Sequence, residues 1–221
     1  MPDIADIVTQ VMQGKSLVKV VINDAETFSL SPGMYHERPL RPNDPVDMPA
    51  FRDWLLRKQY PEALSKAVRY LASRSRSRQE VVRKLQSYEY MEKTVMLVLL
   101  KLEKERLVDD EDFARVWASG RMRRGLGRNR ILQELRQKGV SRQAAEKACA
   151  NVDPEERDED AAKLALKLLK RYAGEPDSAK VIRKVYAAMN RRGFAFEEAS
   201  AAVSRAIALD PQTNLDRFPE W

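Results

Sequence analysis

The sequence predicts a mainly α-helical protein of tandem three-helix repeats, preceded by a small N-terminal β-hairpin. From residue 50 onward apolar residues recur at helical spacing, whereas branched residues typical of strands gather before residue 31. One basic segment also occurs twice, because the run 76–85 returns at 126–135 with an offset of 50 residues. A period of this length is typical of helical units that stack on their neighbours. We therefore expect an elongated, curved stack of repeats.

The N-terminal region combines two kinds of pattern. Residues 17–22 and 27–30 are rich in branched side chains and are joined by Asn23-Asp24-Ala25-Glu26, which predicts a β-hairpin with a polar turn. Ahead of it, four apolar residues have the spacing of a short amphipathic helix: Ile4, Ile7, Val8 and Val11. We expect a short helix followed by a hairpin.

A proline-rich stretch separates this hairpin from the helical body. Five prolines and Gly33 fall within residues 32–49, and proline lacks an amide donor and restricts its predecessor, so an irregular linker is expected. We assign residues 1–48 to the hairpin appendage with its linker. The remaining predicted segments are three helical units and a tail, at 49–104, 105–152, 153–210 and 211–221.

The helical body begins with two short helices, one carrying Phe51 and Trp54 and the next Leu64 and Val68. Another helix starts at Ser77, because the hydroxyl there and the carboxylate three residues later form a capping box. Seven further helices are predicted at 91–103, 109–123, 127–138, 141–150, 154–172, 178–191 and 196–209. The third unit repeats the second more faintly: Val185, Tyr186 and Met189 match Ile131, Leu132 and Leu135, and Gly193 follows Gly139 by 54 residues.

Charge and composition narrow the class of protein. The 221 residues contain 40 Lys and Arg against 33 Asp and Glu, a net charge of +7, and the excess lies in the helical body. A positive body suits a polyanion or an acidic protein surface, although a solvated helical face has the same composition. With Cys149 as the single cysteine there is no internal disulfide, and no long apolar stretch indicates a signal peptide or a membrane span. We expect a cytoplasmic protein without membrane contact.

An enzymatic function is not expected. The chain has one histidine, His36, and one cysteine, Cys149, without the spacing of a metal site or a nucleophile pair, so no metal, cofactor or catalytic residue is predicted. Gly125-Leu126-Gly127 is interpreted as a hinge that ends one helix and starts the next. The acidic run 109–112 is interpreted as helix capping. Tyr88 and Tyr90 lie beside basic residues and could stack on bases, but closing the core of the first unit is the preferred interpretation.

Basic residues recur at one position of the repeats, before and along the second helix of each unit. Recurrence at one structural position favours a shared role, so we predict a basic stripe that contacts phosphates or an acidic protein groove. The candidate residues are Arg74, Arg76, Arg78, Arg83, Lys84, Arg121, Arg123, Arg124, Arg128, Arg130, Lys138, Lys180, Arg183 and Lys184.

Three separate segments have a characteristic order and spacing. They are Arg74-Ser75-Arg76-Ser77-Arg78-Gln79-Glu80-Val81-Val82-Arg83-Lys84-Leu85, then Leu107-Val108-Asp109-Asp110-Glu111-Asp112-Phe113-Ala114, then Gly125-Leu126-Gly127 leading through Ile131, Glu134 and Leu135 to Lys138-Gly139-Val140. Together they resemble the bacterial RecX family of RecA regulators. The resemblance extends over about residues 64–209. Two departures are visible: Tyr88-Glu89-Tyr90 stands where the family's first unit usually turns with a glycine, and the third unit lacks the Gly-x-Gly segment.

The resemblance implies a non-enzymatic modulator, in most relatives an inhibitor, and we expect the protein to be a monomer. It implies binding in the groove of the RecA filament on single-stranded DNA, with effects on recombination, ATP hydrolysis and SOS repressor cleavage. Phosphate contacts to single-stranded DNA, and to duplex DNA as a further option, would accompany the contacts to RecA. Two alternatives stay open: a stand-alone DNA-binding protein, because residues 128–150 also resemble a helix-turn-helix, and an adaptor for an acidic protein.

Overall fold

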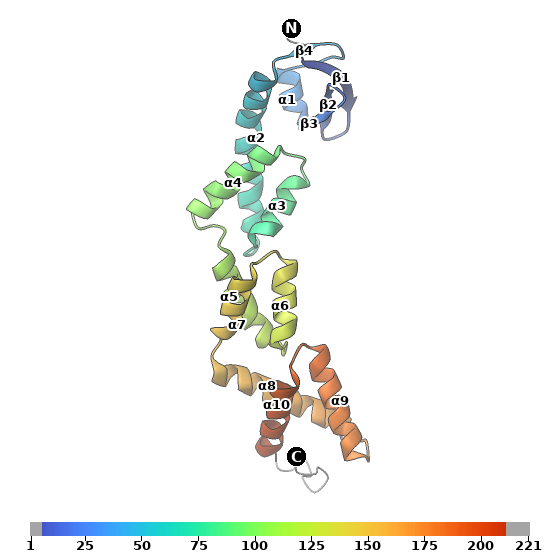
Figure 1. The fold of residues 1–221 in the computed structure, drawn as a ribbon, viewed down its shortest axis with the longest axis vertical. Helices are drawn as coiled ribbons and strands as arrows, with labels where there is room; N and C mark the ends of the chain where they lie inside the picture. The colour runs from blue at the N-terminus through green and yellow to red at the C-terminus, as the bar shows by residue number, and fades with distance from the viewer. Residues whose placement is uncertain (1–5, 211–221) are drawn as a thin grey trace. The chain divides into compact units, whose positions relative to one another are not determined.

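The computed structural model describes residues 6–210 and divides the chain into two compact halves, Met1–Asp109 and Asp110–Trp221. Figure 1 shows strands only at the N-terminal end of the chain and helices from α2 onward. The predicted class, mainly helical with tandem three-helix units and a small N-terminal sheet, is confirmed. Across residues 6–210 no helix combines the length and the apolar character needed to cross a bilayer.

The N-terminal half begins with a four-stranded antiparallel sheet. Its strands are β1 (Asp6–Gln13), β2 (Val18–Ile22), β3 (Glu26–Leu30) and β4 (Pro45–Val46), in the order β3-β2-β1-β4. The predicted hairpin is the pair β2–β3, and Asn23 and Asp24 both have positive φ, 54° and 52°, in its turn. Asn and Asp tolerate this conformation better than other residues with a Cβ, so the turn chemistry determined the hairpin.

The short N-terminal helix was a wrong prediction, because the segment forms β1. Val8 pairs with Ile22 and Val11 with Val20 across the sheet, so cross-strand pairing overrides a spacing that fits a helix equally well. Val8 is buried on the core face, while Ile7 points the other way and is 40% exposed, as the two-residue period of a strand requires. Ile4 lies outside the described residues.

The proline-rich segment is more regular than predicted. It contains the short helix α1 (Pro32–Glu37) and the strand β4. Pro32 occupies the first turn of α1, where the missing amide costs nothing, and the Ser31 hydroxyl caps the helix by accepting the Met34 amide at 3.4 Å. Tyr35 then donates its hydroxyl to the Leu40 carbonyl at 2.7 Å. Side-chain hydrogen bonds therefore supply the order that composition alone did not suggest.

A single helix, α2 (Met48–Leu71), replaces the two short helices expected at the start of the body. It continues through Pro61, and its two ends belong to different cores. Phe51 and Leu55 pack with the sheet and α1, whereas Ala63 and Ala67 pack with α3 (Arg78–Gln86) and α4 (Glu92–Lys104). The sheet and the first three-helix unit, α2–α4, therefore share one rigid element.

The C-terminal half contains two more three-helix units, each with its own core. The second unit consists of α5 (Asp110–Met122), α6 (Arg128–Gln137) and α7 (Arg142–Ala150), and Ile131 and Leu135 are fully buried at its centre. The third unit consists of α8 (Pro154–Tyr172), α9 (Ser178–Arg191) and α10 (Phe196–Leu209). Val185 and Met189 take the same central place in the third core.

The three units keep a strict register at one end of their second helix and lose it at the other. The N-caps Ser77, Gly127 and Asp177 are spaced by 50 residues each. The left-handed residues after the helices are Glu89, Gly139 and Gly193, so the second interval is 54 residues. Helix α9, with 14 residues against 10 in α6, accommodates the four extra residues as one additional turn.

Candidate binding surface

The basic loop of the second unit is built by glycines at both of its ends. Helix α5 ends at Met122, and the turn after it closes at Gly125, whose φ of 71° is left-handed, while the Leu126 amide donates back to the Arg121 carbonyl at 3.1 Å. Helix α6 starts at Gly127, which caps without a side chain. The Gly-x-Gly segment therefore ends one helix and starts the next, as the sequence indicated.

The third unit docks on this same loop, which the sequence did not reveal. The amides of Gly127 and Asn129 donate to the carbonyls of Arg192 and Gly193 at 2.9 and 3.1 Å, so the start of α6 is satisfied by the end of α9. A Cβ on Gly127 would lie 2.3 Å from the Phe194 nitrogen, a distance that no side chain tolerates. The loop is consequently held in place by backbone contacts across two units rather than acting as a hinge.

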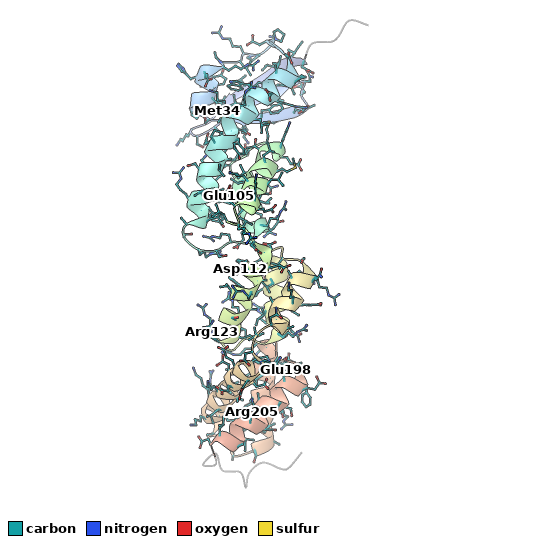
Figure 2. The ribbon with its side chains drawn as sticks, turned by 90° about the vertical axis from the view of Figure 1, so that its left-hand side faces the viewer. Met34, Glu105, Asp112, Arg123, Glu198 and Arg205 are labelled. Carbon is teal, nitrogen blue, oxygen red and sulfur yellow. The ribbon has the colours of Figure 1, made fainter. Side chains whose placement is uncertain are left out.

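Three arginines of this loop have their side chains free. The side chains of Arg123, Arg124 and Arg128 are exposed and make no hydrogen bond or ion pair within residues 6–210. Figure 2 shows Arg123 at the surface of the C-terminal half. Free guanidinium groups on an ordered loop can bind phosphate or carboxylate without first breaking an internal pair.

The other predicted cations of the second unit are already engaged. Arg121 Nε lies 2.8 Å from Glu134 Oε2, as an ion pair rather than a well-aligned hydrogen bond, and Arg130 Nε lies 3.7 Å from the other oxygen. Trp117 donates its indole N–H to the same carboxylate at 3.1 Å. Lys138 Nζ stands 4.3 Å from the Trp117 ring centroid, as a cation–π contact.

The predicted arginines of the first unit are also engaged. Arg74 binds Glu80 at 2.8 Å, which raises the pKa of its guanidinium, and Arg78 Nε binds Glu103 at 2.7 Å. Arg76 lies 4.1 Å above the Tyr70 ring.

Two more predicted cations belong to helix α3 of this unit. Lys84 lies 4.8 Å from the Tyr88 ring, and Arg83 is exposed on the same helix. The basic residues that recur in the first unit therefore include several that hold the unit together.

Of the two tyrosines next to these cations, Tyr90 closes the core of the first unit, as preferred from the sequence, whereas Tyr88 contacts Lys66 and Lys84. Tyr90 packs against its core and donates its hydroxyl to Glu62 at 2.9 Å, and burial raises its pKa to about 12. Lys66 completes the cluster at 4.3 Å from the Tyr88 ring.

In the third unit Lys180 and Lys184 share one carboxylate. Their Nζ atoms lie 3.1 and 2.6 Å from Glu175 Oε2, and these contacts, that of Lys184 first, lower the pKa of Glu175. Arg183 is different, since its side chain is 74% exposed and reaches Asp177 only at 3.8 Å. In the third unit, Arg183 is therefore more available for contact with a binding partner than the two lysines.

A pocket of 310 Å³ adjoins the basic loop, between the second and third units. Arg128, Arg157 and Arg205 line it over an apolar floor that includes Phe194. Asp158 pairs with Arg157 at 3.2 Å and with Arg205 at 3.7 Å.

Two arginines of this pocket could not be selected from sequence patterns. Arg157 lies inside the acidic run 153–160, and Arg205 stands alone on α10, where Figure 2 shows it on the same helix as Glu198. Arg157 and Arg205 come together only because α8 packs against α10 in the folded protein. Within residues 6–210 no three His, Cys, Asp or Glu side chains come together as metal ligands.

The fold defines a helical protein built of tandem three-helix units. Models of the first, second and third three-helix domains of RecX match residues 63–102, 109–148 and 155–203. The chain belongs to the RecX family.

Two relatives and one solved structure show how the chain compares. Regulatory protein RecX of Mycolicibacterium smegmatis is 31% identical over 182 residues, covering 79% of this chain and 96% of the relative. Regulatory protein RecX of Mycolicibacterium vanbaalenii is 34% identical, covering 62% and 78%. A crystal structure of regulatory protein RecX has the same fold, with a TM-score of 0.62, 24% identity and coverage of 90% and 99%.

Proposed function

We propose that this protein is an inhibitor of RecA that binds in the groove of the RecA filament on single-stranded DNA. Through this binding it modulates recombination, ATP hydrolysis and SOS repressor cleavage. The protein acts as a cytoplasmic monomer and by binding alone. Membership of a family of regulatory proteins supports the regulatory role.

The observation that carries the proposal is the set of free arginines on the docked loop. Arg123, Arg124 and Arg128 carry three positive charges on backbone that is hydrogen-bonded to the next unit. A fixed loop loses little conformational entropy on binding, so its charges contribute more of their attraction to affinity. The filament groove, with DNA phosphates and protein carboxylates, is a matching surface.

The test is RecA-catalysed ATP hydrolysis on single-stranded DNA with the protein titrated in. The wild type is expected to lower the rate at a stoichiometric ratio, and the triple variant R123E/R124E/R128E to lose this effect. The matched control K93E/K104E/K167E makes the same change in net charge at exposed lysines outside the loop and should inhibit like the wild type. An inactive wild type would refute the function, whereas equal effects of both variants would refute the site.

A stand-alone DNA-binding function is the second candidate. Helices α6 and α7 are joined by a turn with Gly139 at a φ of 79°, and Arg142 at the start of α7 has a side chain that is 90% exposed and pairs with Glu146 at 2.7 Å. This arrangement places a basic residue where a recognition helix would meet the major groove. Sequence-selective binding of duplex DNA without RecA, lost on Arg142→Ala, would favour it.

A further inference from the structure

The third unit presents an aromatic pair to solvent. Phe196, the first residue of α10, is 70% exposed, and its ring centroid lies 5.3 Å from that of Tyr186 on α9, with the planes tilted by 47°. A surface hollow of 410 Å³ lies beside the two rings, and Asn190 and Arg191 also line it. A phenylalanine exposed to this degree leaves most of its apolar area in water, which folding alone does not favour.

The internal repeat shows that the fold does not require an aromatic residue here. The third helices follow the N-caps Met91, Ser141 and Ala195, so the first helical position is Glu92, Arg142 and Phe196 in the three units. Glu92 and Arg142 are exposed and charged. The same structural position therefore tolerates a polar residue twice, and Phe196 is an addition to the unit rather than part of its core.

The charges around the rings suit a nucleic-acid strand. Arg191 makes no hydrogen bond or ion pair within the described range 6–210, and Arg183 is 74% exposed. Arg183 lies four residues before Ala187 and Arg191 four residues after it, and Ala187 also lines the hollow. Residues spaced by four lie on the same face of a helix, so all three lie on one face of α9. The acidic groups nearby are Glu197, the exposed neighbour of Phe196 in the chain, and Asp177, which lies 3.8 Å from Arg183, so Arg191 is the cation of the two that has no ion pair among the described residues.

We propose that Phe196 and Tyr186 form a platform on which a base of single-stranded DNA stacks. Arg183 and Arg191 bind the adjoining phosphates, and Asn190 supplies an amide that can hydrogen-bond a base edge. Aromatic faces with flanking cations are the combination by which proteins hold unpaired strands with little sequence preference. This inference rests on the proposed function and adds to it a direct contact with bases.

The test compares two labelled strands of equal length, an oligothymidylate and an abasic strand, with the full-length protein by fluorescence anisotropy at low salt. Phe196→Ala should weaken binding of the oligothymidylate about tenfold, the expected contribution of one stacked base, and leave the abasic strand unchanged. Phe196→Trp should retain the affinity. Leu209→Ala removes another exposed apolar side chain from the same helix and serves as the control, which should bind like the wild type.

Several results would overturn the platform. They are no binding of the oligothymidylate by the wild type, no loss on Phe196→Ala, or an equal loss on both strands. If Phe196→Ala bound the oligonucleotide with unchanged affinity but bound RecA more weakly in the absence of DNA, the rings would be assigned to a protein partner. That result would also contradict the proposal. The RecA assay is independent: a protein that stacks bases through Phe196 but leaves RecA unaffected would refute the proposed function and retain this inference.

Discussion

Gly127 and Gly193 touch backbone to backbone where the second and third units meet. A Cβ on Gly127 would fall 2.4 Å from the Gly193 carbonyl carbon, and a Cβ on Gly193 would fall 2.4 Å from the Arg130 nitrogen. Hydrogen bonds from Gly127 and Asn129 cross the same contact. The glycines therefore fix how these two units pack.

Gly127→Ala should push the second and third units apart at this contact. We expect the free energy of unfolding to fall by about 1–3 kcal/mol, because the added methyl group meets backbone that cannot move aside. Urea denaturation measures the loss, and faster hydrogen exchange at the Asn129 amide locates it. Gly120→Ala is the control: its Cβ meets nothing within 4 Å inside α5, and the substitution should stabilise by about 0.5–1 kcal/mol. Unchanged exchange at Asn129 would contradict the prediction.

Glu89 occupies a left-handed position that glycine fills in the other two units. Its φ is 58°, and its carboxylate accepts hydrogen bonds from Ser29 at 2.6 Å and Lys19 at 2.9 Å, which join the sheet to the first unit. Glu89→Gly removes both the backbone strain and the contacts, whereas Glu89→Ala removes only the contacts. We expect Ala to be less stable than Gly by about 1 kcal/mol in urea denaturation. The reverse order would show that the backbone here is not strained.

The same carboxylate makes the sheet's attachment pH-dependent. The hydrogen bond from Ser29, and then that from Lys19, lowers the pKa of Glu89 in the folded protein. Its stabilisation is therefore complete above the unfolded pKa of about 4.3 and is lost as pH falls through the lowered folded value. The side chain is 43% exposed, so the contribution is at most about 1 kcal/mol. Unfolding free energies of wild type and Glu89→Gln should differ at pH 6, and the difference should shrink progressively as pH falls below about 4.3; a constant difference would contradict this.

Gln59 connects the sheet to the helices through a buried amide. Its oxygen accepts from the Met91 amide and the Thr94 hydroxyl, both at 3.0 Å, and its nitrogen donates to the Ser29 carbonyl at 3.1 Å. Gln59→Leu removes the partner of the buried Thr94 hydroxyl, of the buried Ser29 carbonyl and of the partly buried Met91 amide, and we expect a loss of about 2–4 kcal/mol. Gln86→Leu, an exposed change of the same kind on α3, should shift stability by less than about 0.5 kcal/mol. Equal effects in thermal denaturation would rule out the bridging role.

Salt dependence tests whether the free arginines contact phosphate. Replacing Arg123, Arg124 and Arg128 by alanine should lower the slope of log affinity against log salt for single-stranded DNA by about 2, since each phosphate contact contributes about 0.7. The slope is measured by anisotropy over a salt series. Replacing the paired Arg74, Arg78 and Arg121 should change it less, and equal changes would mean that pairing does not determine availability.

The helices of the body were predictable from sequence because local signals mark their ends. Ser77 with Glu80, Ser141 and Asp177 cap their helices, and all three helices of the third unit have the predicted bounds. The N-terminal region was not predictable in the same way. The apolar spacing around Val8 fits a helix or a strand, and the choice depends on pairing with Ile22.

The basic residues of the candidate site were predictable from sequence, but which of their side chains lack an intramolecular partner was not. Arg74 and Arg124 have similar sequence surroundings, yet the first has Glu80 as a partner and the second has none within residues 6–210. The backbone docking of Gly127 was equally hidden, because its partner carbonyl belongs to Arg192, far along the chain. The pairing of the arginines and the docking of Gly127 both depend on contacts between segments that are distant in sequence, which local sequence patterns do not indicate.

The extra turn of α9 indicates how such units change in length. Four residues advance a helix by slightly more than one full rotation, so Val185 and Met189 meet the core at nearly the same azimuth as Ile131 and Leu135. Insertions of one, two or five residues would instead rotate polar side chains inward. Length variation among these units is therefore expected in whole turns of helix, and any sequence comparison between units should permit gaps of four before gaps of any other size.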